Sequence, residues 1–194
     1  PVVPYITIRK TDREDQATFE AILKKSERDF EWPVFIKPCK AGSSVGANKA
    51  SNKEEFIKAV DDALLWDDKI LVEAFINARE IECSVTGFRQ ISAYTPGEIV
   101  PTHEFYDYEA KYLDPEGAAL KIPADLDEEK IREVRDIAIK AFKALDGCGC
   151  SRIDFFLDKD NGKFYLNEIN TMPGFTNISM FPKLCEASGL PYPD

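Results

Sequence analysis

The sequence has one histidine, an odd number of cysteines and no long apolar run. His103 is the only histidine, and of the five cysteines only Cys148 and Cys150 lie close together. A structural zinc site needs four regularly spaced ligands, so we expect reduced cysteines in a cytoplasmic protein rather than zinc. No segment approaches the roughly 18 to 20 apolar residues of a membrane span, and we expect no membrane partner.

Basic residues are also scarce. The chain carries 25 Lys and Arg against 35 Asp and Glu, which gives a net charge of -10. A nucleic-acid partner would require a basic face, so we expect none. With 194 residues, 44% of them apolar, the chain is long enough to bury a core in one large domain or two small lobes.

Alternating and helical patterns in the first third predict a small α+β lobe. Its expected elements are a strand at 5–9, a helix capped by Asp12 and ending near residue 27, a strand at 33–38, a turn at 41–46, a helix capped by Ser51 with Glu54 in a capping box, and a strand at 69–75.

The remaining chain predicts a second lobe with more strands. Its expected elements are strands at 81–87, 91–94 and 98–100, a long loop at 102–116, a helix from the cap Asp127 to Gly147, and a hairpin of 150–158 and 163–170. A loop as long as 102–116 is usually functional or disordered.

The hairpin carries the first candidate site. Glu168 and Asn170 are two residues apart on a strand and share a face. A two-residue turn at 161–162 would place Asp154 opposite Ile169, whereas a three-residue turn at 160–162 places it opposite Glu168. In the second register, two carboxylates and an amide oxygen gather as magnesium ligands. A solvated polar sheet face is the alternative.

A second candidate site combines Lys37, at the end of a buried strand, with the Gly-Ser-Ser loop that follows it. An ammonium and backbone N–H groups there would suit phosphates, although an ordinary Gly-Ser turn is the alternative. Glu73 and Glu80 could mark a hinge where a purine lies, or be exposed carboxylates at strand ends. Arg152 shares the face of Asp154 and could neutralise an oxyanion.

The aromatic loop around Lys111 and Tyr112 is expected to close over a ligand, or else to pack on the protein's own surface. It belongs to a series of segments in a fixed order. They are FIKP (35–38), AGSSVG (41–46), VEAF (72–75), FYDYEAKYLD (105–114), CSRIDFF (150–156) and NEINTMPGFTNISMFPKL (167–184). Together they resemble the ATP-grasp superfamily, and within it the D-alanine–D-alanine ligase family. The resemblance implies an α+β ATP-grasp fold with a small lobe at 1–75, a large lobe at 76–194 and the nucleotide between them.

The resemblance also implies roles for individual residues. The residues implied to contact the nucleotide are Lys37, Ser43, Ser44, Glu73, Ala74, Phe75, Glu80, Lys111 and Asn167. Those implied to bind two magnesium ions, or manganese, are Asp154, Glu168 and Asn170. Those implied to act in catalysis or to contact D-alanine are Ser43, Lys111, Tyr112, Arg152, Gly174, Ser179 and Met180. The implied reaction joins two D-alanines through an acyl phosphate, with ATP as phosphoryl donor, for peptidoglycan synthesis.

Three departures from the family qualify this interpretation. The family has an N-terminal domain before residue 1 and a closing helix after Pro193, and Ala74 stands where many relatives carry a lysine. We therefore expect a monomeric fragment that binds ATP weakly and does not ligate, from a homodimeric enzyme. The alternatives are an ATP-grasp ligase for another carboxylate and a non-catalytic ATP-binding module. The EAKY segment argues against the first, and the presence of Lys111 and Arg152 argues against the second.

Overall fold

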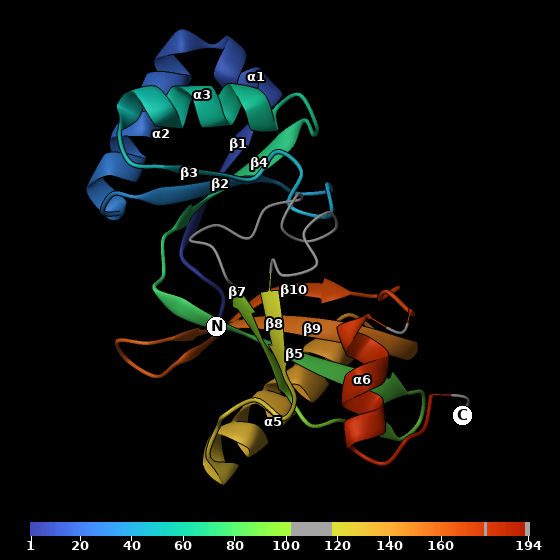
Figure 1. Ribbon diagram of the computed structural model, residues 1–194. Helices are drawn as coiled ribbons and strands as arrows, with labels where there is room; N and C mark the ends of the chain where they lie inside the picture. Colours follow the sequence, from blue (N-terminus) through green and yellow to red (C-terminus); the bar gives the residue numbers. More distant parts are fainter. Residues whose placement is uncertain (102–117, 177, 193–194) are drawn as a thin grey trace. The chain divides into compact units, whose positions relative to one another are not determined.

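The computed structural model describes residues 1–101, 118–176 and 178–192, which fall into two compact units (Figure 1). The smaller unit comprises residues 3–76. The larger unit comprises the first two residues, 77–101 and the described residues from 118 onward. In the described part of the chain, no helix has the length and apolarity to cross a membrane.

The smaller unit is a four-stranded antiparallel sheet with helices on one face (Figure 1). Its strands, in sheet order, are β1 (Tyr5–Arg9), β4 (Lys69–Ala74), β2 (Val34–Pro38) and β3 (Asn48–Ala50). Its helices are α1 (Lys10–Glu14), α2 (Gln16–Asp29) and α3 (Lys53–Ala63).

Alternation along β2 and β4 separates the two faces of this sheet. Val34, Ile36 and Val72 are buried in a core with Phe56 of α3 and Phe19 of α2. Because side chains alternate along a strand, the residues between them lie on the other face. That face carries Phe35, Lys37 and Glu73.

Both predicted helix caps in this unit are wrong by one to three residues. Asp15, not Asp12, caps the long helix, because its carboxylate accepts the Thr18 N–H at 3.1 Å. Asp12 lies inside α1 and accepts the N–H of Arg9. Asn52, not Ser51, caps α3, and Glu55 rather than Glu54 accepts the Ser51 N–H at 2.8 Å.

The larger unit is a six-stranded antiparallel sheet with two helices beside it (Figure 1). Its strands are β5 (Ala78–Gly87), β6 (Ile91–Ala93), β7 (Gly97–Pro101), β8 (Ala118–Lys121), β9 (Gly149–Asp158) and β10 (Phe164–Asn170), and its helices are α5 (Glu128–Ala144) and α6 (Met180–Ala187). The sheet order is β10-β9-β5-β7-β8, with β6 also paired to β5.

The central strand β5 presents one face to each helix. Ile81, Cys83 and Val85 pack in a core with Val134 and Phe142 of α5. Ser84 lies on the other face, where its hydroxyl donates to the Phe181 carbonyl of α6 at 3.1 Å. The α6 face of the sheet therefore also carries Glu80 and Glu82, the neighbours of Ser84 at two-residue spacing.

Candidate active site

The β9–β10 hairpin determines which side chains of the predicted metal site meet. Near its turn, Phe164 pairs with Leu157 and Leu166 with Phe155, but farther along Glu168 pairs with Asp154. The register shifts by one residue at Asn167, which is a β-bulge. The prediction that Asp154 faces Glu168 is confirmed.

The predicted three-residue turn is wrong. Asp158 donates its N–H to the Lys163 carbonyl at 3.0 Å, so the turn holds the four residues 159–162. In a regular hairpin this turn would place Asp154 opposite Asn167, and the bulge restores the pairing with Glu168. The bulge also lets Leu166 and Ile169, three residues apart, both pack on the α5 core.

Asn170 joins the two carboxylates. Its amide nitrogen lies 3.0 Å from Asp154 Oδ2 and 3.3 Å from Glu168 Oε1. Asp154 is buried, whereas Glu168 is exposed. The three side chains converge on the α6 face of the sheet and form a cluster with one solvent-facing carboxylate.

Arg152 completes this cluster, together with a residue that sequence reasoning missed. The guanidinium donates two hydrogen bonds to Asp154, Nε to Oδ1 and Nη2 to Oδ2, both at 2.8 Å. The same Nε lies 3.0 Å from Oε2 of Glu82, whose side chain is only 7% exposed. The sequence does contain a signal for Glu82: Glu80, Glu82 and Ser84 are spaced two residues apart and so share one face of a strand. Glu82 pairs with Asp154 across β5 and β9, which puts both on that face.

The charges around Arg152 fix its protonation. Burial lowers the pKa of the guanidinium, but the hydrogen bonds that it donates to Asp154 and the charges of Asp154, Glu82 and Glu168 outweigh burial and raise the pKa above its ordinary value. Arg152 is therefore a permanent cation beside three carboxylates.

The cluster fits a hard divalent cation. Among the described residues, no group of three or more His, Cys, Asp and Glu side chains is arranged to hold a metal ion, so carboxylates alone do not form a site. Asp154 and Glu168 supply carboxylate oxygens, and rotation of the Asn170 amide presents its oxygen in place of its nitrogen. Two carboxylates and an amide oxygen are ligands that Mg²⁺ accepts.

In the smaller unit, Lys37 and Glu73 form an ion pair. Lys37 Nζ lies 2.9 Å from Glu73 Oε2, and their side chains are 22% and 12% exposed. Because the two strands are adjacent, the pair lies diagonally across β2 and β4 on the face away from the helices. The structure thus brings together two of the predicted nucleotide contacts.

The loop at 41–46 follows directly after β2. Ser43 and Ser44 adopt left-handed backbone conformations, with φ of 57° and 60°. The base of the loop is held by buried Asp67, which accepts the Lys40 N–H at 2.8 Å and the Lys69 N–H at 3.2 Å. Consecutive left-handed residues turn the chain tightly, and the turn is closed by the Val45 N–H, which donates to the Gly42 carbonyl at 3.1 Å.

The other expected nucleotide contacts lie on several elements. Ala74 is half-buried at the end of β4, and the exposed ring of Phe75 lies under Lys49 Nζ at 4.8 Å. Glu80 is half-buried on β5, and Asn167 is the bulge residue. Lys111 and Tyr112 lie outside the described residues.

The segment before α6 contains the remaining expected substrate contacts. Ser179 Oγ accepts the Thr176 N–H at 3.1 Å. A Cβ added to Gly174 would lie 2.9 Å from the same oxygen, so only glycine fits there without movement of Ser179. Met180 is buried and packs toward Gly97.

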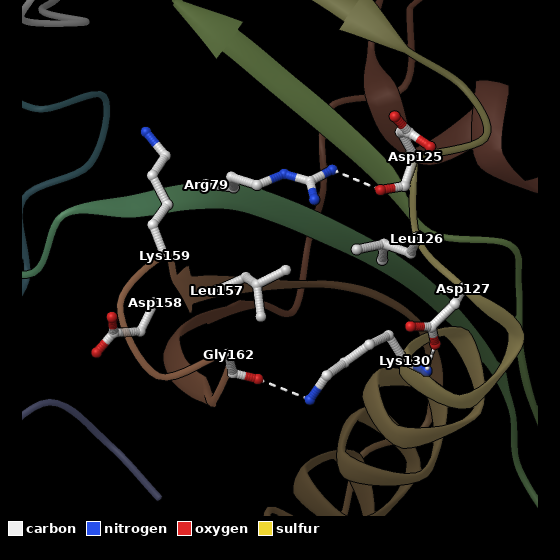
Figure 2. A pocket seen from close by; sticks show the side chains of 9 residues that line it. All are labelled: Arg79, Asp125, Leu126, Asp127, Lys130, Leu157, Asp158, Lys159 and Gly162. Atoms are coloured by element: carbon white, nitrogen blue, oxygen red, sulfur yellow. Dashed lines mark hydrogen bonds between the residues drawn. The ribbon is translucent and has the colours of Figure 1, made fainter.

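A separate pocket of about 320 Å³ lies on the α5 face, beside the β9–β10 turn (Figure 2). Arg79 donates to the Asp125 carbonyl at 2.8 Å and is paired with Glu98. Lys130 donates to the Gly162 carbonyl at 2.6 Å, and the backbone N–H of Lys130 donates to Asp127. The polar groups of this pocket are thus largely hydrogen-bonded to one another.

Comparison with known proteins shows which family the chain belongs to. The model of the D-Ala-D-Ala ligase C-terminal family matches residues 1–194, the whole chain. The chain belongs to this family.

Relatives of the family share much of the sequence. The chain is 62% identical, over 192 residues, to the D-alanine–D-alanine ligase of Treponema denticola, covering 99% of the chain and 52% of that protein. It is 52% identical, over 184 residues, to that of Acetivibrio thermocellus, covering 95% of the chain and 49% of that protein. The chain thus spans about half the length of these relatives.

Solved structures of the family share the fold. The D-alanine–D-alanine ligase of Coxiella burnetii is 38% identical, with a TM-score of 0.80 over 100% of this chain and 49% of its own. The VanG D-Ala:D-Ser ligase of Enterococcus faecalis is 33% identical, with a TM-score of 0.85 over 98% of this chain and 53% of its own. The chain has the ATP-grasp fold of this family, as the sequence predicted.

Proposed function

We propose that this chain is the ATP-binding part of a D-alanine–D-alanine ligase and that Asp154, Glu168 and Asn170 bind its magnesium. The convergence of these three side chains, with Asn170 within 3.0 Å of Asp154 and 3.3 Å of Glu168, carries the proposal. The membership of the chain in the family supports it.

In the larger unit, the proposed roles follow from charge. Two Mg²⁺ ions, or Mn²⁺, would neutralise the phosphate oxygens of ATP when bound. Arg152, a permanent cation beside Asp154, stabilises the oxyanion together with the Gly174 N–H. Glu80 binds the ribose hydroxyls, and Asn167 contributes a nucleotide contact.

In the smaller unit, the ion pair of Lys37 and Glu73 supplies opposite charges for one nucleotide. Lys37 contacts phosphate and the adenine edge, and the Glu73 carboxylate accepts a hydrogen bond from the adenine amino group. Ala74 and Phe75 line the adenine. Ser43 and Ser44, which lie at the tight turn of this loop, contact the phosphates.

The substrate residues are assigned from the family resemblance and from the segment before α6. Ser179, with Met180 beside it, receives the carboxylate of the second D-alanine. Lys111 binds the terminal phosphate, and Tyr112, steadied by Ser43, favours D-alanine as acceptor. One D-alanine is activated as an acyl phosphate, and the amine of the second displaces phosphate.

For the whole protein we propose a cytoplasmic homodimer that supplies peptidoglycan precursors and so maintains cell shape. ATP and D-alanine are its substrates. The chain of 194 residues alone is proposed to be a monomer that binds ATP weakly without ligating, because it spans about half of its relatives.

The proposal is tested by titrating a non-hydrolysable ATP analogue with and without Mg²⁺, using the wild type and Glu168→Ala. Exposed Glu129 in the first turn of α5 provides the control Glu129→Ala, which changes the net charge equally. We expect Mg²⁺ to strengthen binding in the wild type and the control but not in Glu168→Ala. Equal, metal-independent binding in all three proteins would contradict the magnesium assignment.

A further inference from the structure

We propose that Glu82 is a positioning residue for Arg152, which it holds while a bound cation engages Asp154. This inference rests on the proposed function of the Asp154 cluster. It concerns a residue of β5 that belongs neither to the magnesium ligands nor to the nucleotide contacts.

The sheet places Glu82 directly beside the cluster. Glu82 pairs with Asp154 across β5 and β9, and Asp154 pairs with Glu168 across β9 and β10. The three carboxylates therefore form a row across three adjacent strands. Arg152 extends from the middle strand, two residues before Asp154, so its side chain lies on the same face.

Arg152 is shared between two members of this row. Its Nε donates a hydrogen bond to Asp154 Oδ1 at 2.8 Å and forms an ion pair with Glu82 Oε2 at 3.0 Å, so one side of the guanidinium faces two carboxylates. A cation that takes electron density from Asp154 weakens the hydrogen bonds between Asp154 and Arg152. Glu82 keeps a partner at Nε throughout, and the guanidinium remains at the cluster in position for an oxyanion.

The burial of Glu82 and Arg152 makes each depend on the other as a partner. Its side chain is 7% exposed and that of Arg152 is 21% exposed, so water offers little replacement for a lost partner. A buried charge that loses its partner is strongly disfavoured. Without the charge of Glu82, Arg152 would hold Asp154 more tightly and oppose the cation.

The chain offers a matched control in Glu98 of β7. Its side chain is 9% exposed and it forms an ion pair with Arg79, with Nε to Oε1 at 2.8 Å, on the α5 side of the same sheet. Glu98→Gln therefore removes an equally buried, arginine-paired carboxylate away from the cluster.

The test measures Mn²⁺ binding, with a non-hydrolysable ATP analogue present, by electron paramagnetic resonance. We expect Glu82→Gln to weaken Mn²⁺ binding about five- to ten-fold, and Glu98→Gln to change it less than about two-fold. Glu82→Asp keeps the charge but shortens the reach, so it should also weaken binding. Wild-type affinity in either Glu82 variant overturns the proposal, and thermal unfolding verifies that each variant is folded.

A second arm separates positioning from simple charge. In an Arg152→Gln background there is no cation for Glu82 to hold, so Glu82→Gln should change Mn²⁺ affinity no more than Glu98→Gln does. An equal loss in both backgrounds would mean that Glu82 acts on the cation by its charge alone, and would overturn the positioning role.

These outcomes distinguish the two proposals. If Glu168→Ala abolishes Mn²⁺ binding but Glu82→Gln behaves like Glu98→Gln, the positioning role fails and the proposed function stands. If the wild type shows no Mn²⁺ binding in the presence of the analogue, both fail.

Discussion

Glu168 lies directly opposite Asp154 across β9 and β10, although the turn between these strands would by itself place Asn167 there. A four-residue turn and a one-residue bulge together give the pairing. The same bulge allows Leu166 and Ile169 to pack on the core while Glu168 and Asn170 lie on the other face. The acidic cluster therefore depends on an irregularity of the strand as well as on alternation.

The first prediction concerns the base of the nucleotide. Glu73 is proposed to accept a hydrogen bond from the adenine amino group. Guanine carries a carbonyl oxygen at the same position of the ring, and a carboxylate repels that oxygen. We expect Glu73→Gln, which can donate as well as accept, to reduce the preference for ATP over GTP about ten-fold. The measurement is competitive binding of ATP and GTP analogues.

The control for this comparison is Glu54→Gln, because Glu54 is an exposed carboxylate in the first turn of α3 in the same unit. It should leave the ATP to GTP ratio unchanged. The same ratio in the wild type and Glu73→Gln would show that Glu73 does not contact the base.

The second prediction concerns Asp67 and pH. Burial raises the pKa of this carboxyl, but the N–H groups of Lys69 and Lys40 and the charge of Lys40 outweigh burial, so the pKa lies below its ordinary value. A folded pKa below the unfolded value, near about 4, stabilises the protein above that pH and loses this effect as pH falls through the folded pKa.

Asp67→Asn should therefore lower the free energy of unfolding by about 1 to 3 kcal/mol at neutral pH, and the difference from the wild type should shrink below about pH 4. Thermal unfolding from pH 2 to 7 measures this. Asp68→Asn is the control, since the Asp68 side chain is 84% exposed. A difference that stays constant down to the lowest pH would refute the assignment.

The third prediction concerns packing behind the candidate site. A Cβ on Gly147 would lie 2.6 Å from the ring of Phe142, which is buried in the core under β5. Gly147→Ala should destabilise the larger unit by about 1 to 3 kcal/mol because the ring must move. In a Phe142→Leu background the same substitution should cost less, and an equal cost in both backgrounds would exclude this clash.

The sequence predicted the elements that have strong periodicity. The helix after Asp127 and the strands at 5–9 and 33–38 are present, and Asp127 caps α5 through the Lys130 N–H at 2.8 Å. The short strands β3 and β8 and helix α6 were not predicted. Pro182 lies in the first turn of α6, where proline is tolerated, but it hides the helical pattern.

The candidate site was predictable to the extent that its residues share a strand. Two-residue spacing gave Glu168 with Asn170 and Arg152 with Asp154, and those pairs face the same cluster. Glu82 was missed because its contact with Arg152 spans two strands 70 residues apart in sequence, and their pairing is decided by packing. The bulge at Asn167 was missed because no local composition distinguishes it.

The assignment of Asp154, Glu168 and Asn170 can be examined in a crystal of the chain grown with Mn²⁺ and a non-hydrolysable ATP analogue, using anomalous diffraction from the metal. We predict two anomalous peaks next to the analogue's phosphates, each within about 2.3 Å of oxygen atoms of these side chains and together contacting all three. A peak held by other residues, or analogue bound with no metal at these side chains, would contradict the magnesium site.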